Sequence, residues 1–300
     1  MRLIGDIPIY VAPDSADVWT HQECFQLDPQ TRQPTHVAGV PPDYFSATGQ
    51  RWGNPLFCWH ERDRRVRERL YDWWRLRFQR VFSQVDIVRI DHFRGFESFW
   101  RIPATEPDAV QGEWVKGPGQ AFFTEMAAAI GELPIIAEDL GLITPEVEEL
   151  RDALGFPGMK VLQFAFDSDQ TNAYLPCNYA TTNCVVYTGT HDNDTTVGWY
   201  FSDKAGQAAK ERLMRYAHSR EGSPVHWDFI RLGMASVAAV LIIPLQDVLG
   251  FGSDCRMNLP STSQGNWRWR VAPRFLTGPL AVRLRDETVF YNRDPREEED

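Results

Sequence analysis

The stretch VDIVRID, residues 85–91, is the best guide to the fold, because it is a short β-branched run that ends in charged residues. Short apolar runs with little polar alternation are typical of strands that are buried on both faces, as in a parallel sheet. The sequence therefore predicts six parallel strands, because runs of the same kind recur at residues 3–11, 135–139, 159–166, 184–192 and 238–245.

Helical patterns lie between several of these runs. Residues 63–84 carry Val66, Leu70, Trp74 and Phe78 at spacings of four, which is an amphipathic stripe. The other face of this segment is rich in arginine, and we interpret it as a solvated face rather than a phosphate-binding surface. Strands that alternate with helices indicate an α/β fold. Further helices are expected at residues 119–130, 144–154 and 206–218.

The composition is that of a globular protein: 300 residues, of which 43% are hydrophobic and 24% are charged. The formal net charge of −10 argues against binding nucleic acid or an anionic membrane through bulk charge. No apolar run approaches the roughly 20 residues of a membrane span, and the first residues do not resemble a signal peptide. We therefore expect a cytoplasmic protein. The acidic residues 295–300, PREEED, are expected to be a frayed end.

The cysteines and histidines do not form a recognisable metal or disulfide pattern. The seven histidines include no H-x-x-x-H pair, and HDND at residues 191–194 lacks the spacing of a calcium loop. No metal site is therefore expected. The five cysteines are scattered, without C-x-x-C, and we interpret them as reduced thiols: Cys24, Cys58, Cys177, Cys184 and Cys255.

Residues 28–59 differ from the rest of the chain because they are rich in Pro, Gly and aromatic residues, as in GVPPDYFSATGQRWGNP. Long connections in compact domains are usually functional. Aromatic side chains can stack on the apolar faces of a sugar, and amides can hydrogen-bond its hydroxyls. The stretch is therefore interpreted as a substrate-covering loop or subdomain, and the alternative is a loop that packs its own aromatic residues.

Acidic residues stand at the ends of three of the expected strands. Alternation along VDIVRID puts Arg89 and Asp91 on one face, while IIAED carries Glu138 and TGTHD ends with Asp192. In a parallel α/β barrel these strand ends converge on one rim, where active sites form. Any one of these acids could be an ordinary helix cap or turn residue, but three in the same position favour a shared site.

Such a group of carboxylates suits the cleavage of a glycosidic bond with retention of configuration. That reaction needs a carboxylate nucleophile and a carboxylic acid roughly 5–5.5 Å apart. Neighbouring carboxylates would raise the pKa of the acid, and a third one could stabilise positive charge at the anomeric carbon. Arg89 is expected to keep Asp91 ionised and oriented, and His191 could donate a hydrogen bond to a sugar hydroxyl.

Three motifs in this order, VRIDHFRG (88–95), IIAEDLG (135–141) and TGTHDNDT (188–195), resemble those of the 4-α-glucanotransferases, or amylomaltases, of the α-amylase superfamily. The segments at 5–19, 39–55 and 256–270 (RMNLPSTSQGNWRWR) are also similar to that family. The resemblance implies a (β/α)8 TIM-barrel fold, of which only about strands three to eight are present in this chain. It also implies that residues 1–300 form a single, incomplete catalytic domain.

The resemblance implies a role for each of the three acids. Asp91 matches the nucleophile, Glu138 the general acid/base and Asp192 the transition-state stabiliser. The substrates implied are maltooligosaccharides and α-1,4-glucans derived from starch or glycogen. Members of the family need no organic cofactor and typically no metal.

Further residues match the substrate-binding positions of the family. Arg89 and His191 match residues that position the nucleophile and bind the glucose ring at the cleavage site, and Asp6 matches a position near the donor sugar. The contacts implied on the acceptor side are Asp43, Tyr44, Phe45, Gln50, Trp52 and Asn54.

The short chain leaves three functions open. The first is transfer of a glucan segment from Asp91 to the 4-hydroxyl of another sugar, and the second is hydrolysis, in which water takes the segment. The aromatic residues of 43–54 favour transfer, because a covered acceptor site favours sugar over water. The third is an inactive glucan-binding fragment, since a segment that precedes this chain in the family would be missing.

Overall fold

The computed structural model describes residues 1–43, 46–203, 205–220 and 222–294. Contacts within the chain divide it into two compact units, Met1–Gly158 and Met159–Asp300, and each is described by itself. The six expected strands are present, three of them in each of two sheets. The expected frayed end at residues 295–300 lies outside the described residues, and the organisation as a single domain stays a prediction.

The first unit contains a parallel sheet with the strand order β1–β4–β7. β1 spans Ile4–Pro8, β4 spans Ile87–Asp91 and β7 spans Ile135–Ala137. The register places Asp6 of β1 opposite Arg89 of β4. Neighbouring strands therefore bring two of the predicted site residues side by side.

The first unit also contains an antiparallel sheet with the strand order β3–β2–β5–β6, which the sequence pattern does not predict. Two of its strands lie within residues 28–59, so the expected loop or subdomain contains part of a sheet, and its role in covering the substrate stays a prediction. These strands contain glycine and proline and lack a long apolar run, so they are specified by their pairing with each other and by the pairing of the first of them with residues 100–103. The bounds are β2 His36–Val40, β3 Gln50–Pro55, β5 Ser98–Pro103 and β6 Glu113–Lys116.

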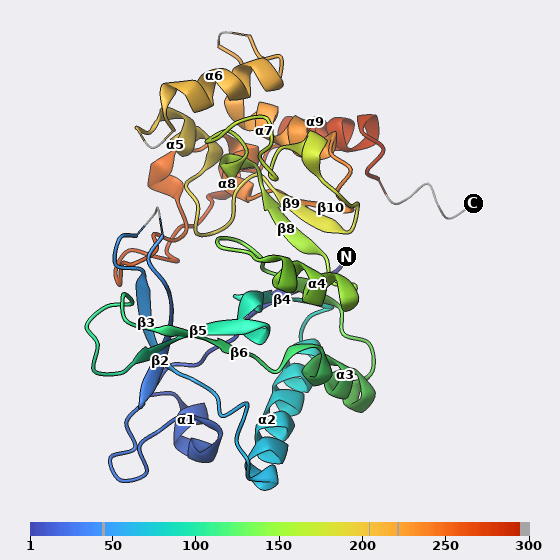
Figure 1. Ribbon diagram of the computed structural model, residues 1–300. Coiled ribbons are helices and arrows are strands. Elements are labelled where there is room, and N and C mark those ends of the chain that lie inside the picture. The colour runs from blue at the N-terminus through green and yellow to red at the C-terminus, as the bar shows by residue number, and fades with distance from the viewer. Residues whose placement is uncertain (44–45, 204, 221, 295–300) are drawn as a thin grey trace. The chain divides into compact units, whose positions relative to one another are not determined.

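Three of the expected helices belong to the first unit, and their bounds agree closely with the prediction. The side chain of Asp63 caps the longest helix by accepting a hydrogen bond from the Arg65 N–H. Figure 1 shows α2 and α3 next to each other. The helices are α1 Ala16–Thr20, α2 Arg64–Phe82, α3 Gly119–Ile130 and α4 Pro145–Ala153, with 3₁₀ turns η1 Gln22–Cys24 and η2 Phe93–Phe96.

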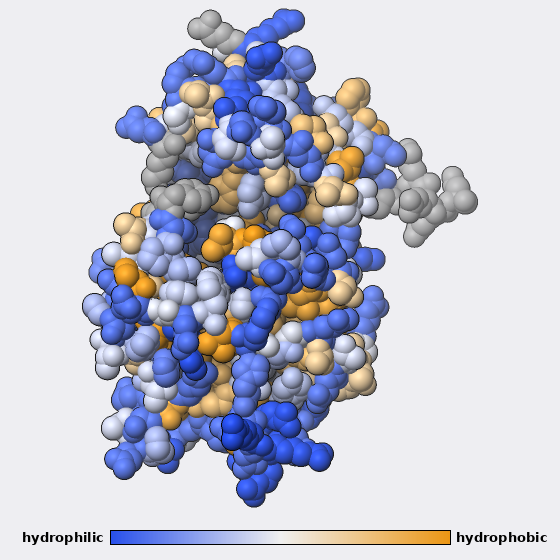
Figure 2. Space-filling view, in the orientation of Figure 1, coloured by the Kyte–Doolittle hydropathy of each residue, from blue (hydrophilic) through white to orange (hydrophobic). Residues whose placement is uncertain are grey.

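The arginine-rich face of α2 is solvated, as predicted. The side chains of Arg64 and Arg65 are 82% and 84% exposed and pair with Glu68 and Asp63 at 2.7 and 3.2 Å. Figure 2 shows a strongly hydrophilic surface where α2 lies in Figure 1. Exposed pairs of this kind contribute about 0–1 kcal/mol each, so the face is explained by solubility rather than by a ligand.

Aromatic side chains fill the core of the first unit. Phe57, Trp74, Phe96 and Phe122 are each fully buried. The ring centroids of Phe57 and Trp74 lie 5.6 Å apart, and those of Phe96 and Phe122 lie 5.2 Å apart. The end of the 28–59 stretch is therefore anchored in the same core as α2 and α3.

The second unit contains a sheet with the strand order β10–β9–β8, in which β9 and β10 are parallel. β8 spans Gly158–Val161 and begins at the last residue of the first unit; β9 spans Cys184–Tyr187 and β10 spans Val240–Ile242. Each strand is shorter than its apolar run, and after β8 the chain enters a 3₁₀ turn, η3 Leu162–Phe164. The helices are α5 Thr196–Phe201, α6 Gln207–Tyr216, α7 Val225–Met234, α8 Leu245–Leu249 and α9 Gly278–Phe290.

A buried carboxylate holds part of the second unit together. Asp247 of α8 is fully buried and accepts hydrogen bonds from the Thr188 hydroxyl at 2.6 Å and from the backbone N–H of Thr196 at 2.8 Å. Thr188 follows β9 and Thr196 begins α5, so Asp247 links α8 to the end of β9 and to the start of α5. Among the described residues, no helix is long and apolar enough to cross a membrane.

Candidate active site

Arg89 joins two of the predicted acids at the end of the parallel sheet in the first unit. Its guanidinium donates to Asp6 Oδ2 at 2.6 Å and to Asp91 Oδ1 at 2.9 Å. The Arg89 side chain is only 10% exposed, whereas those of Asp6 and Asp91 are 43% and 47% exposed. The arginine is thus fixed within the protein while both carboxylates face a solvent-accessible space. The predicted contact between Arg89 and Asp91 is confirmed, and Asp6 joins it through the register of β1 and β4.

Glu138 directly follows β7 and is held by the backbone of the neighbouring strand end. Its N–H donates to the carbonyl of Ile90 at 3.0 Å. Its carboxylate accepts hydrogen bonds from the N–H of His92 at 2.7 Å and from the N–H of Leu140 at 2.9 Å. The two oxygens are therefore fixed by main-chain groups, which are less mobile than side chains.

The surroundings of Glu138 favour its protonated form. The pKa of the Glu138 carboxyl is raised to about 7, because burial and, to a smaller extent, the negative charge of Asp91 outweigh the lowering effect of Arg89 and the two N–H donors. The expected cause, a neighbouring carboxylate, contributes to this rise, but burial is the larger cause. An acid with a pKa near neutrality beside a carboxylate is the combination that proton-assisted displacement at a sugar requires.

The residue after Glu138 reinforces the same strand end. Asp139 is 7% exposed and pairs with the guanidinium of Arg151 in α4 at 2.5 Å. A Cβ at Gly158 would collide with the Asp139 carboxylate, so the glycine leaves room for this ion pair. The backbone that carries Glu138 is thereby fixed from α4 and from the start of β8.

His92 is a further residue of this site, and the sequence pattern does not predict it. It follows Asp91 with φ 54° and ψ 49°, in the left-handed region, and this turn directs its N–H toward Glu138. Burial lowers the pKa of the imidazole to about 3, so the ring is neutral at ordinary pH. Its Nε2 atom is buried without a hydrogen-bond partner among the described residues. The only signal in the sequence is a polar residue next to the candidate nucleophile.

The ring of His92 connects the carboxylates to β3. Trp52 lies edge-on to it, with ring centroids 4.8 Å apart and an interplanar angle of 90°, and Tyr10 lies 6.4 Å away. The Trp52 side chain is partly exposed and its Nε1 donates to Gln50 Oε1 at 3.2 Å. Two of the predicted acceptor-side residues, Gln50 and Trp52, therefore lie close to the strand end that carries Asp91.

The other predicted acceptor-side residues are less directly connected with this site. The Asn54 amide donates to the carbonyl of Val11 at 2.8 Å, which holds β3 to the segment after β1. Asp43 is exposed and accepts a hydrogen bond from the Ser46 N–H at 2.7 Å. Tyr44 and Phe45 lie outside the described residues.

The left-handed backbone of His92 predicts a specific order of stability among substitutions. We expect His92→Val to unfold more easily than His92→Asn by about 1–2 kcal/mol, because a β-branched residue is strained at positive φ whereas asparagine adopts it readily. Both variants lose the ring, so the loss of the ring does not contribute to the difference between them. Urea unfolding followed by circular dichroism measures it, and equal midpoints would contradict the prediction.

The second unit contains the other two predicted residues of the cleavage site, His191 and Asp192. Asp192 Oδ1 accepts a hydrogen bond from the Asn258 amide at 2.6 Å, and His191 Nε2 lies 3.5 Å from Asp192 Oδ2. Arg256 donates to the main-chain carbonyls of Asp192 and Asn258. The segment that begins at Arg256 therefore fixes both the backbone and the side chain of Asp192.

An exposed aromatic ring lies beside this pair. Trp267 is 56% exposed, and its ring centroid is 5.1 Å from that of His191. The backbone N–H of Trp267 donates to the Met257 carbonyl at 2.8 Å, which fixes the turn that presents the ring. Such a ring can stack on a sugar. Arg256, Asn258 and Trp267 all belong to RMNLPSTSQGNWRWR, to which the sequence analysis gives no individual roles.

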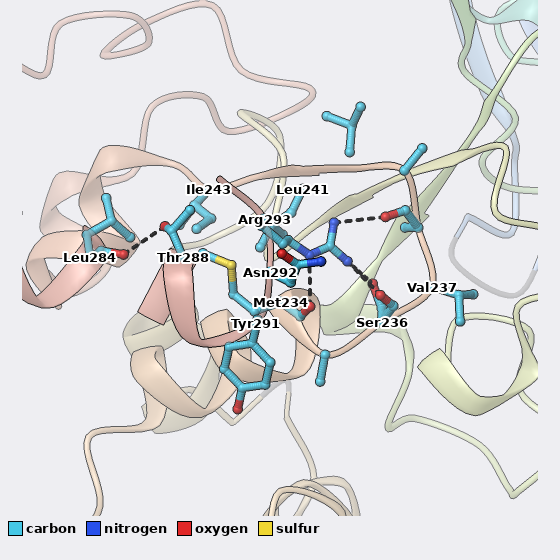
Figure 3. A pocket seen from close by; sticks show the side chains of 14 residues that line it. Met234, Ser236, Val237, Leu241, Ile243, Leu284, Thr288, Tyr291, Asn292 and Arg293 are labelled. Carbon is cyan, nitrogen blue, oxygen red and sulfur yellow. Dashed lines mark hydrogen bonds between the residues drawn. The ribbon is translucent and has the colours of Figure 1, made fainter. Parts of the chain in front are cut away.

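A cavity of about 840 Å³ in the second unit has a different character (Figure 3). Its charged side chain, Arg293, donates to the carbonyls of Met234 at 2.8 Å, Ser236 at 2.6 Å and Ala238 at 2.8 Å. The guanidinium is thus used to cap the backbone between α7 and β10. None of the predicted site residues is among the described residues that line this cavity, so we do not assign chemistry to it.

The part of the chain that the structure describes contains no group of three or more His, Cys, Asp or Glu residues arranged to hold a metal ion. The acids of the first unit are instead linked through Arg89 and backbone N–H groups.

Residues 1–277 match the family model described as 4-alpha-glucanotransferase. The 4-alpha-glucanotransferase of Synechocystis sp. is 54% identical over 294 residues, which cover 98% of this chain and 57% of that protein. The enzyme of the same name from Thermus thermophilus is 53% identical over 291 residues, which cover 95% of this chain and 57% of that protein. The chain thus spans a little over half the length of these relatives.

Solved structures agree with the sequence comparison. The amylomaltase from Streptococcus agalactiae in complex with acarbose has a TM-score of 0.90 and 39% identity, covering 98% of this chain and 58% of that one. The amylomaltase from Corynebacterium glutamicum has a TM-score of 0.77 at 19% identity, a likeness of fold alone. The predicted fold class, a (β/α)8-barrel type of which this chain carries a part, is confirmed.

Proposed function

Because the chain belongs to the 4-alpha-glucanotransferase family, we propose that it carries the catalytic residues for moving an α-1,4-glucan segment to the 4-hydroxyl of an acceptor glucose or maltooligosaccharide. One observation carries the proposal. Asp91 and Glu138 stand at adjacent strand ends, one bound by Arg89 and the other with its pKa raised to about 7. A carboxylate nucleophile and a protonated acid are the two groups that retaining glycosyl transfer needs.

In the first step, Glu138 gives its proton to the glycosidic oxygen that leaves, while an Asp91 oxygen forms a bond to the anomeric carbon. The glucan segment is then covalently attached to Asp91. In the second step, the ionised Glu138 takes the proton of the acceptor hydroxyl as that oxygen displaces Asp91. Arg89 orients Asp91 through both steps, and the N–H groups of His92 and Leu140 orient Glu138.

Asp192 is the third carboxylate of the proposal, and we assign it to stabilising positive charge at the anomeric carbon. The assignment rests on the similarity of TGTHDNDT to the family motif. The contacts of Asp192 with Asn258 and His191 support it, because they fix a half-exposed carboxylate in one orientation. His191 and Asp6 are proposed to bind sugar hydroxyls.

Maltotriose as the sole substrate tests the function. Transfer produces glucose together with chains longer than maltotriose, whereas hydrolysis produces only shorter ones. Thin-layer or anion-exchange chromatography of the products of the purified chain separates the two outcomes. Maltotriose that remains unchanged, in a sample whose circular dichroism shows a folded protein, would refute activity of these residues on their own.

Trp52 provides a test of acceptor selection. We expect Trp52→Ala to lower transfer several-fold more than hydrolysis, because the exposed ring beside His92 would stack on the acceptor sugar and exclude water. The ratio of long-chain products to net reducing ends measures the effect. The matched control is Trp19→Ala, which removes another exposed tryptophan of the same unit. An unchanged ratio in Trp52→Ala would contradict the role.

We propose a cytoplasmic location for the protein. The cysteines support it, since all five are free, as suits a reducing compartment. Cell fractionation followed by immunoblotting tests the proposal. Recovery outside the cytoplasmic fraction would refute it.

A further inference from the structure

Cys24 and Cys58 occupy facing positions where the 28–59 stretch leaves the core and returns to it. An isolated antiparallel bridge pairs Phe25 with Phe57. Hydrogen bonds flank this bridge on both sides: Gln26 N–H donates to Leu56 O at 2.8 Å, and Cys58 N–H donates to Cys24 O at 2.9 Å. The two cysteines are therefore directly opposite each other, one position beyond the phenylalanine pair.

The spacing of such a pair falls within the range of a disulfide. Cys24 and Cys58 share one of the two hydrogen bonds of a regular antiparallel pair, because the Cys24 N–H donates to the carbonyl of His21. Facing residues of a regular hydrogen-bonded pair have Cα atoms about 5.5 Å apart, and disulfides join Cα atoms roughly 4.4–6.8 Å apart. The bridged phenylalanines keep the two segments in register, because their rings lie 5.1 Å apart inside the aromatic core. The two thiols also interact electrostatically, since Cys58 contributes to the raised pKa of Cys24.

We propose that Cys24 and Cys58 form a reversible dithiol–disulfide pair. When a low-molecular-weight disulfide oxidises the protein, the new disulfide links the two ends of the segment 25–57. Both residues are free thiols in this structure, which is the reduced form. The proposal does not depend on the proposed glucan chemistry.

The difference in exposure of the two thiols sets the order of the reaction. Cys24 is fully buried, whereas Cys58 is partly exposed. The Cys58 thiolate attacks one sulfur of oxidised glutathione, forms a mixed disulfide and releases one glutathione thiolate. The Cys24 thiolate then attacks the Cys58 sulfur and releases the second glutathione. The protein loses two electrons and two thiol protons, and one glutathione disulfide becomes two glutathione thiols.

The environment of the thiols makes this a slow process at neutral pH. Burial raises the pKa of Cys24 to about 12 and that of Cys58 to about 11, so few thiolates are present at pH 7. Oxidation should therefore accelerate about tenfold for each pH unit between 7 and 9. The pair would stay reduced during brief exposure to oxidant and close under a sustained one.

Closure would restrain the segment that carries β2 and β3, and with them Gln50 and Trp52. A disulfide that closes a loop of this length stabilises the fold mainly by restricting the unfolded chain. We expect the melting temperature to rise by roughly 5 °C on oxidation. Strain in a hydrogen-bonded cross-strand position would make the bond easy to reduce again.

Peptide mapping tests the proposal directly. The full chain is incubated with oxidised glutathione at pH 8.5, alkylated with iodoacetamide and digested with trypsin without reduction. Arg32 and Arg51 lie between the cysteines, so a disulfide would link peptides 3–32 and 52–62. The expected result is this linked pair, lost on treatment with dithiothreitol, together with the higher melting temperature.

Matched variants make the result specific. Cys58→Ser should lose both the linked peptides and the rise in melting temperature, whereas Cys177→Ser, which removes an exposed thiol of the second unit, should retain both. If Cys58→Ser unfolds, Cys58→Ala serves in its place. Three results would overturn the proposal: glutathione that remains on Cys58, alkylation of both thiols after prolonged oxidation, or a link from Cys24 to another cysteine.

Discussion

Glu138→Gln is expected to reduce turnover of maltotriose by about a thousandfold or more. Glutamine can still accept a hydrogen bond from His92 or Leu140, so the side chain keeps its place, but it has no proton to give to the leaving oxygen. Loss of a general acid typically costs about 10²–10⁴ in rate, and the same residue serves again as the base in the second step. Glucose release under saturating substrate measures the loss.

The pH dependence of the unsubstituted chain belongs to the same prediction. A general acid must be protonated, so the rate should fall as pH rises through about 7, the raised pKa of Glu138. An ordinary glutamate would place this fall nearly three pH units lower. In Glu138→Gln the residual rate should lose that decline. The exposed Glu132→Gln serves as the control, with an unchanged rate and pH profile; near-normal turnover of Glu138→Gln would remove the acid assignment.

Asp91→Asn is expected to have an equal or larger effect, a loss of about four orders of magnitude, because an amide oxygen cannot form the covalent glycosyl intermediate. Asparagine is nearly isosteric with aspartate and still offers an oxygen to Arg89, so the strand end should keep its form. The expected result is a folded protein with unchanged melting behaviour and no measurable product from maltotriose.

Trapping the intermediate distinguishes a nucleophile from a residue that only orients the site. In Glu138→Gln, an activated α-glucosyl fluoride needs no acid to leave, so glucose should accumulate on Asp91 and raise the protein mass by one glucosyl unit. The double substitution with Asp91→Asn should show no added mass. The exposed Asp72→Asn, combined with Glu138→Gln, is the matched control and should still be labelled. A labelled double variant lacking Asp91 would refute the assignment.

The parallel strands could be predicted because their signal is local. Runs such as VDIVRID are apolar over a few residues and need no distant partner to be recognised, and β4 forms at the end of that run. The strands β3 and β6 are different: QRWGNP and EWVK contain few apolar residues, and each pairs with the strand that precedes it in the chain, β2 and β5. The two hairpins are joined by the pairing of β2 with β5, which lie far apart in the sequence. The four-stranded sheet therefore depends on a contact that no short sequence window contains.

The contacts of the candidate site could be predicted where the alternation along a strand, or the register between two strands, determines which side chains meet. Period-two alternation brings Arg89 and Asp91 together, and the contact with Asp6 follows once β1 pairs with β4. The raised pKa of Glu138 could be anticipated in direction but not in its main cause, because burial is a property of the packed structure.

His92 could not be predicted from the sequence for a similar reason. Its role rests on a left-handed backbone turn, a neutral ring and a neighbouring tryptophan from another strand. The spacing of residues encodes none of these. Asn258 and Trp267 likewise meet His191 and Asp192 only after the segment that carries them has folded back.

Gly158, Asp139 and Arg151 should vary together as relatives of this protein diverge. The Asp139 carboxylate fills the space that a side chain at position 158 would need, and it does so to reach Arg151. A lineage that loses the arginine would leave a buried charge uncompensated, and one that gains alanine at 158 would displace it. We expect an alignment to show that these three positions change together. The residue at position 158, twenty positions after Glu138, should therefore indicate whether a relative keeps the ion pair next to Glu138.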